Sequence, residues 1–263
     1  MLKFKVYRFE KEKDDKPRYD TFSIEEREGM TVLEALFTIK EELDGTLAFR
    51  YSCRGAVCGS CAMLINGTPM LACRTQVKDV KRGRLAAELR VRGSFGVPAI
   101  KKINSGEVLV EPLSNLPVLK DLIVDMKRFF DAYKSIEPWL KGEEAPPDKE
   151  HRLSQKEMEK VEPYINCILC GACYAACPVS ARDESYLGPA ALAKAWRFLA
   201  DPRYKGKTEL LERVNSHQGV WGCDTVYRCV DVCPKEVPPT QGITAIRRSL
   251  LLNKLKILRR FND

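Results

Sequence analysis

Residues 53–73, CRGAVCGSCAMLINGTPMLAC, decide how the N-terminal part of this chain folds. Four cysteines in this stretch have the spacing C-x4-C-x2-C with a fourth twelve residues further on, namely Cys53, Cys58, Cys61 and Cys73. This spacing is typical of plant-type [2Fe–2S] sites. Three thiolates must converge on one side of such a cluster, so the loop has to wrap tightly, and Gly55 and Gly59 are expected to supply the permissive backbone. The fourth thiolate is expected at the end of a hairpin that turns at Asn66-Gly67.

Zinc is the alternative occupant for any set of four cysteines. Zinc sites usually present two separated C-x2-C pairs, whereas these cysteines lie in one wrapped loop, so an iron–sulfur cluster is favoured. The N-terminal MLKFKVYRFE lacks the apolar segment of a secretory signal, which predicts a protein of the reducing cytosol. Disulfides are therefore a poor explanation for the 11 cysteines of the 263-residue chain, and metal ligation is the better one.

The segments around the loop predict a mixed α+β domain. Residues 3–9 and 19–26 alternate polar and apolar side chains as paired strands do. Thr31 and Glu34 form a capping box that opens a helix ending at Gly45. The sequence thus predicts a first domain over residues 1–105.

The remaining residues, 106–263, predict a mainly helical second domain. Apolar side chains recur at helical spacing through residues 118–136, and Pro138, Gly142 and Pro146-Pro147 indicate a connector after that helix. Further helices are predicted at residues 154–161, 189–199, 209–214 and 242–258.

A second group of cysteines follows the bacterial pattern C-x2-C-x2-C-x3-C-P, in which the fourth cysteine binds a different cluster from the first three. A partner motif repeats this run near the C-terminus, with Val226 where its second cysteine belongs. The count therefore assigns Cys167, Cys170, Cys173 and Cys233 to a [4Fe–4S] cluster. Three thiolates are left for a [3Fe–4S] cluster, with Val226 over the vacant corner: Cys177, Cys223 and Cys229.

Nothing else in the sequence indicates bond-making chemistry. His151 and His217 are the two histidines, and neither lies in a motif that pairs a base with a nucleophile. The chain has neither G-x-G-x-x-G nor a P-loop, so it is not expected to bind its own flavin or nucleotide. The formal net charge of +8 is concentrated in residues 81–102 and 243–263. In the second of these stretches Ile246, Leu250 and Ile257 can share one face of a helix, which predicts a basic tail at a membrane-anchor interface.

The chain resembles the iron–sulfur subunits of succinate dehydrogenase and fumarate reductase over nearly its whole length. The resemblance rests on GMTVLEAL, FRYSCRGAVCGSCAMLINGTPMLAC, PLSNLPVLKDLIVDM, CILCGACYAACP, LGPAALAKAWRF and the closing C-x5-C-x3-C-P. It implies a β-grasp ferredoxin domain followed by a helical ferredoxin domain, in an electron-transfer subunit that is not itself catalytic. The implied partners are a FAD-containing flavoprotein and a quinone-binding membrane anchor that can carry haem, with no nucleic acid. The implied location is peripheral, on the cytoplasmic face of the membrane.

The resemblance also points to a quinone near the [3Fe–4S] ligands. Family members that use ubiquinone commonly carry a tryptophan and a histidine where this chain has Ala181, Arg182 and Asp224. Pro178 matches the family's pocket wall, and Arg247 falls where the family tends to carry a basic residue near the quinone. Because this tryptophan and histidine are missing, the resemblance predicts menaquinone. The charge of Arg182 or Arg247 would stabilise the reduced quinone. A competing interpretation pairs Arg182 with Asp183 or Glu184.

Two other classes of protein fit the sequence less well. An electron-transfer subunit of a thiol- or heterodisulfide-linked flavoprotein complex usually appends cysteine-rich repeats, whereas this chain ends soon after Cys233. A free-standing ferredoxin or redox sensor would need no basic amphipathic tail. The basic stretch at residues 81–102 is absent from the usual family pattern and has no assigned role.

Overall fold

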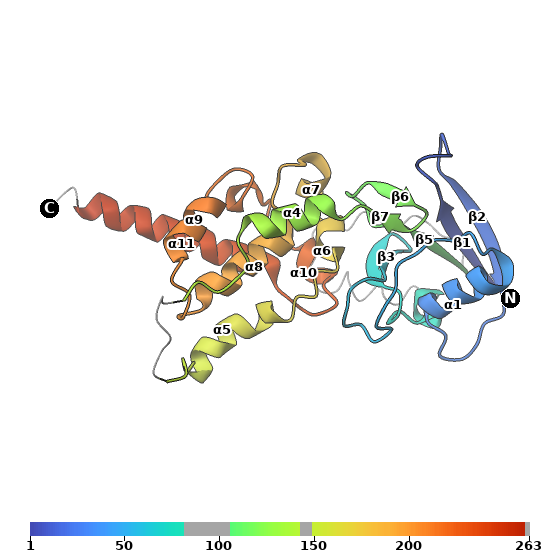
Figure 1. The fold of residues 1–263 in the computed structure, drawn as a ribbon, viewed down its shortest axis with the longest axis horizontal. Helices are drawn as coiled ribbons and strands as arrows, with labels where there is room; N and C mark the ends of the chain where they lie inside the picture. Colours follow the sequence, from blue (N-terminus) through green and yellow to red (C-terminus); the bar gives the residue numbers. More distant parts are fainter. Residues whose placement is uncertain (82–105, 143–148, 261–263) are drawn as a thin grey trace.

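The computed structural model describes residues 1–81, 106–142 and 149–260, with side chains up to residue 253. Figure 1 shows a sheet-containing part formed by the N-terminal residues and a helical part formed by the C-terminal residues. The predicted α+β class is confirmed. The predicted connector around Pro146-Pro147 and most of the basic stretch after Lys81 lie outside the described residues.

Five strands form the first sheet, in the order β2-β1-β5-β3-β4. Their bounds are β1 Leu2–Arg8, β2 Arg18–Ile24, β3 Ala62–Ile65, β4 Thr68–Leu71 and β5 Glu107–Glu111. Strand β1 buries every second side chain, as its alternation predicts, with Leu2, Phe4 and Val6 in the core. The β3–β4 hairpin turns at Asn66-Gly67, where both residues have positive φ.

Helix α1, Val32–Thr38, begins at the predicted capping box, since Thr31 accepts from the Glu34 N–H and Glu34 accepts from the Thr31 N–H. A π-helical turn, η1, continues it over Ile39–Leu43. The buried side of α1 packs into the same core as β1. A short helix α2, Val77–Lys81, follows the last cysteine of the first group.

The boundary predicted at residue 105 falls before a strand that belongs to the first sheet. Strand β5 pairs in parallel with β1, with Phe4 opposite Val108, and it also pairs with β3. Sequence analysis missed this strand because its hydrogen-bonding partners lie far away along the chain. We therefore propose that the N-terminal domain extends beyond residue 111.

The single helix predicted over residues 118–136 is wrong in its first half. A small hairpin occupies that half, with β6 at Val118–Lys120 and β7 at Ile123–Val124, and the helix α4 covers only Lys127–Ser135. Asp121 at the turn has φ of 47°, which a helix cannot accommodate. Its carboxylate accepts hydrogen bonds from Arg8 Nε at 3.0 Å and from the Ala48 N–H at 2.9 Å. These tertiary contacts override the helical spacing of the apolar residues.

The helical part packs around α8, whose apolar face is buried. Its elements are α5 Gln155–Ile165, α6 Ala172–Ala175, α7 Pro178–Arg182, α8 Gly188–Ala200, α9 Lys207–Val214, η2 Val220–Gly222, α10 Arg228–Asp231 and α11 Pro239–Arg260. The four helices predicted from spacing are confirmed, with α11 starting three residues earlier than expected. None of the described helices is long and apolar enough to cross a membrane.

The first turns of α11 do not present the apolar face that the sequence predicts for a membrane-anchor interface. Ile246 and Leu250 are buried in the core with Ile243, against residues of α8. Beyond them Leu251 and Leu252 are 51% and 47% exposed. In Figure 1 the end of α11 projects away from the other helices. Ile257 lies among the residues whose side chains the structure does not describe.

A buried ion pair joins β1 to the β6–β7 turn. Arg8 and Asp121 are 4% and 2% exposed, and Arg8 also pairs with Asp44 and Asp20. Removing a carboxylate from a buried pair leaves the other charge without compensation.

Asp121→Ala is therefore expected to lower the free energy of unfolding by about 3 kcal/mol. The matched control Asp20→Ala removes a more exposed partner of Arg8 and is expected to cost about 1 kcal/mol or less. Urea unfolding followed by circular dichroism measures both values. Equal losses in the two variants would contradict the role given to the buried pair.

Candidate cluster-binding sites

The structure brings the 11 cysteines together in three groups. The groups are the four cysteines of the first loop, four in the helical part around one pocket, and three beside Tyr186. These are the sets that the spacing predicts, and we describe them in turn as sites A, B and C. No three or more Cys, His, Asp or Glu side chains among the described residues are placed to hold a single metal ion.

Site A contains Cys53, Cys58, Cys61 and Cys73, on the loop before β3 and directly after β4. Backbone N–H groups of Gly55, Val57 and Cys58 point at the Cys53 sulfur, at N···S distances of 3.4, 3.3 and 3.2 Å. The Ser60 N–H similarly donates to Cys58 Sγ at 3.4 Å. Such donors favour a negatively charged sulfur, as a cluster ligand requires.

The loop of site A wraps by positive φ angles at three places. Gly59 has φ of +75°, as expected of a glycine, whereas Gly55 has no positive φ.

 Arg54 and Ala56, on either side of Gly55, have φ of 54° and 57°. This left-handed conformation costs a non-glycine residue free energy. The prediction that the loop needs the permissive backbone of Gly55 is therefore wrong. The backbone strain lies at its two neighbours instead.

The pKa values of two thiols in site A are shifted in opposite directions. A hydrogen bond with Ser60, followed by the one with Cys53, lowers the pKa of the Cys58 thiol to about 6. Burial raises the pKa of Cys61 to about 12, and the adjacent Cys73 contributes to this shift. Deprotonating the Cys61 thiol at neutral pH therefore needs a nearby positive charge, which bound iron would supply.

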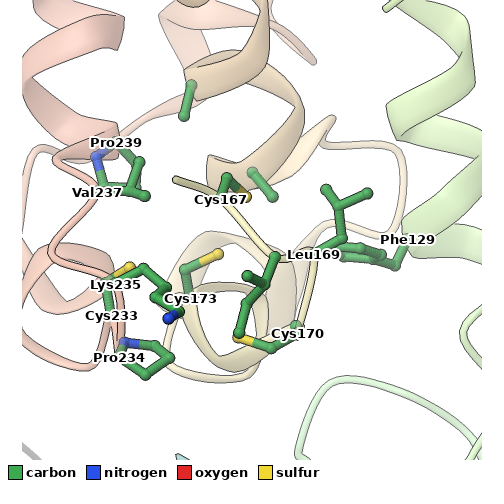
Figure 2. Close-up of a pocket in the computed structure, with 14 residues that line it drawn as sticks. Phe129, Cys167, Leu169, Cys170, Cys173, Cys233, Pro234, Lys235, Val237 and Pro239 are labelled. Atoms are coloured by element: carbon green, nitrogen blue, oxygen red, sulfur yellow. The ribbon is translucent and has the colours of Figure 1, made fainter. Parts of the chain in front are cut away.

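Site B is a pocket lined by cysteines from three segments. Figure 2 shows these cysteines around it: Cys167, Cys170, Cys173 and Cys233. Cys167 and Cys170 precede α6, Cys173 lies on α6, and Cys233 follows α10. The rest of the lining is largely apolar and includes Phe129, Ala193 and Val237. Four sulfur atoms around a largely apolar pocket fit the ligand set predicted for a [4Fe–4S] cluster.

Burial dominates the electrostatics of site B. It raises the pKa of Cys170 to about 11 and that of Cys173 well above its ordinary value, and the neighbouring thiolates add to both shifts. Cys233 shifts in the same direction for the same first reason. Binding iron here would therefore release protons from the thiols.

Site C contains Cys177, Cys223 and Cys229, which all raise the pKa of Tyr186 after the larger effect of its burial. The Tyr186 hydroxyl is buried and has no hydrogen-bond partner among the described residues. Burial raises the pKa of Cys229 to about 12, and Thr240 Oγ1 lies 3.1 Å from its sulfur. A buried hydroxyl beside three thiols fits a site that is completed by a sulfur-containing cluster.

Arg247 holds the loop of site C instead of facing outward. Its Nε donates to the Val220 carbonyl at 2.8 Å, and its Nη2 donates to the Cys223 carbonyl at 2.6 Å. Its Nη1 donates to Thr225 Oγ1 at 3.1 Å. Sequence analysis missed this role because the carbonyls come from residues more than 20 positions away.

The other residues predicted near a quinone lie beside site C. Pro178 begins α7 directly after Cys177, and Ala181 and Arg182 are exposed at the end of that helix. Arg182 pairs with Asp224, by two contacts of 2.7 and 2.8 Å, rather than with Asp183 or Glu184 as the competing interpretation holds. This pair lowers the pKa of Asp224, and Arg247 adds to the shift.

Site B adjoins both of the other sites. Gly59 of site A packs against Cys170 of site B. Within the helical part, the pKa of Cys173 in site B is raised by burial and in part by Cys229 of site C. Site B is therefore close to site A and to site C.

Comparison with known proteins identifies two iron–sulfur domains in this chain. A family model for a 2Fe-2S iron-sulfur cluster binding domain matches residues 3–131, and one for a 4Fe-4S dicluster domain matches residues 164–237. The chain is thus a two-domain iron–sulfur protein of the ferredoxin type. The first model also extends past residue 105, as strand β5 does.

Curated relatives identify the family. The fumarate reductase iron-sulfur subunit of Haemophilus influenzae is 35% identical, over 92% of this chain and 90% of the relative. The succinate dehydrogenase iron-sulfur subunit of Paracoccus denitrificans is also 35% identical, over 95% and 88%. The chain belongs to the family of iron–sulfur subunits of succinate dehydrogenase and fumarate reductase, and the resemblance found in the sequence is confirmed.

The fold has a solved counterpart. A chain described as the Mycobacterium smegmatis Sdh1 complex in the apo form superimposes with a TM-score of 0.80, and 97% of each chain is covered. The two sequences are 22% identical, so this likeness supports the fold alone.

Proposed function

We propose that this chain carries electrons between a FAD-containing succinate or fumarate subunit and a membrane quinone. The observation that carries the proposal is the closeness of the three cysteine groups, in which site B adjoins site A and site C. Iron–sulfur clusters accept and release single electrons, at potentials set by cluster type, hydrogen bonds and burial. The names of the relatives favour this function over a thiol- or heterodisulfide-linked complex.

We assign the cluster ligands that the cysteine spacing predicts. The three groups of cysteines in the structure support this assignment. Site A would hold a [2Fe–2S] cluster, site B a [4Fe–4S] cluster and site C a [3Fe–4S] cluster. In site C the chain supplies three thiols, and Val226 occupies the position of a fourth in the motif. Thr225 and Tyr227, on either side of Val226, have positive φ angles, so the loop turns tightly at this position.

Val226→Cys would supply the missing thiolate and is expected to convert site C toward a [4Fe–4S] cluster of lower potential. The change is measured by electron paramagnetic resonance (EPR) of the oxidised protein, in which a three-iron signal should decrease. Val232→Cys is the matched control, because Val232 lines a different pocket, between the β3–β4 hairpin and α10. An unchanged oxidised spectrum in Val226→Cys would contradict the ligand assignment.

The flavoprotein partner would bind at the exposed side of site A. Tyr51 and Val57 are exposed apolar side chains beside Cys53, which is itself exposed. The Arg54 guanidinium stacks over the rings of Phe37 and Tyr51 at 4.7 and 5.6 Å from their centroids. An aromatic and arginine surface of this kind is common at protein interfaces.

The quinone would bind near the Arg182–Asp224 pair, beside Pro178 and Ala181, and we propose menaquinone. Arg182 is the better candidate for the charge, because Arg247 already uses Nε, Nη1 and Nη2 to hold the loop of site C. An exposed guanidinium can donate to a quinone oxygen once it leaves Asp224.

Arg182→Ala is expected to slow quinone reduction by the assembled complex, whereas Asp224→Asn, which frees the guanidinium, is not. The assay uses menaquinone and ubiquinone analogues and compares both variants with the wild type. If Arg182 acts only through its ion pair, the two variants lose activity equally, and the proposed contact fails. Faster turnover of the wild type with ubiquinone would contradict the choice of menaquinone.

We propose that the membrane anchor contacts the projecting end of α11, and that the chain is a peripheral subunit on the cytoplasmic face of the membrane. Leu251 and Leu252 are exposed there, and the segment that follows them carries Lys254, Lys256, Arg259 and Arg260. Basic charge next to exposed leucines suits an anionic membrane interface.

A chain that ends at Asn253 keeps the core residues Ile246 and Leu250 and is expected to leave the membrane together with the flavoprotein. Membrane and soluble fractions are assayed with an artificial electron acceptor, and iron content per chain is the control for folding. Retention of the shortened chain on the membrane with the anchor would contradict the proposed contact.

A further inference from the structure

Gly59 is the point at which the loop of site A touches the loop of site B. A Cβ atom built at Gly59 would lie 2.8 Å from the Cβ of Cys170, 2.9 Å from its Cα and 3.0 Å from the Ile168 carbonyl oxygen. Carbon atoms in normal contact are about 3.5–4.0 Å apart. Any side chain at this position would therefore push the two loops apart by a fraction of an ångström to about 1 Å.

A second contact joins the same two sites. Arg74, directly after Cys73, donates from Nη1 to the carbonyl of Pro234 at 3.4 Å, and Pro234 directly follows Cys233. The loops also line one shared pocket, to which site A contributes Cys58 and site B contributes Cys170. Two ligand segments of site A thus meet two ligand segments of site B.

We propose that Gly59 is a positioning residue for electron transfer, because its missing side chain sets the separation between Cys58 and Cys170. The proposal rests on the proposed function, in which these cysteines bind different clusters. One electron passes between the two groups, so one is oxidised as the other is reduced, and no bond forms or breaks. The rate of such a transfer falls steeply with distance, so a contact between two main chains favours it.

The backbone angle of Gly59 does not explain its position by itself. Gly67, in the β3–β4 turn, has the same φ of +75° and nothing within 4 Å of the Cβ that would be added. The two glycines therefore share the conformational requirement and differ in the space around them. Asparagine tolerates this backbone region better than other residues do, so it adds a side chain with less strain than alanine.

The experiment compares Gly59→Ala and Gly59→Asn with Gly67→Ala and Gly67→Asn in the full-length chain within its complex. The readout is the magnetic interaction between the reduced groups of sites A and B, observed by EPR as splitting and faster spin relaxation. We expect weaker splitting and slower relaxation in both Gly59 variants, with iron content unchanged. The Gly67 variants are expected to keep the wild-type interaction.

Unchanged splitting in the Gly59 variants, with both signals present, would overturn the proposal. Loss of the site A signal in Gly59→Asn but not in Gly67→Asn would also overturn it, since the residue would then serve to build the loop rather than to set the gap. A wild-type protein that lacks either signal would instead contradict the proposed function, so the two failures are distinguishable.

Discussion

The burial of several thiols close together is the constraint on which this structure depends. Burial raises the pKa of Cys61, Cys170 and Cys229, so at neutral pH these groups resist becoming the thiolates that a cluster needs. Iron supplies the positive charge that offsets this cost, which links cluster binding to the stability of the loops. On the more exposed side of site A, hydrogen bonds with Ser60 and Cys53 lower the pKa of the Cys58 thiol.

Much of the fold follows from local patterns in the sequence. The Asn66-Gly67 turn, the Thr31–Glu34 capping box and the helical spacing of α8 each depend on residues close together in the chain, and the structure has all three. The grouping of the cysteines could also be predicted from the sequence, because the motif spacing restricts which thiols can meet. Their role as ligands stays a prediction.

The errors have a common physical cause, which is contact between distant residues. Asp121 binds Arg8 and the backbone at Ala48, and these contacts replace a predicted helix with a hairpin. The sequence likewise did not indicate that Arg247 binds carbonyls of the site C loop, which lie more than 20 residues away. Ile246 and Leu250 are apolar residues on a basic helix. This pattern is typical both of helices at a membrane surface and of helices packed on a protein core, and here both residues lie in the core.

The central claim is that the 11 cysteines hold three clusters of different type, and iron analysis combined with Mössbauer spectroscopy of the anaerobically purified protein tests it most directly. The account predicts about nine iron atoms per chain, divided among two-iron, four-iron and three-iron components. Stoichiometric zinc, or a second four-iron component in place of the three-iron one, would contradict it.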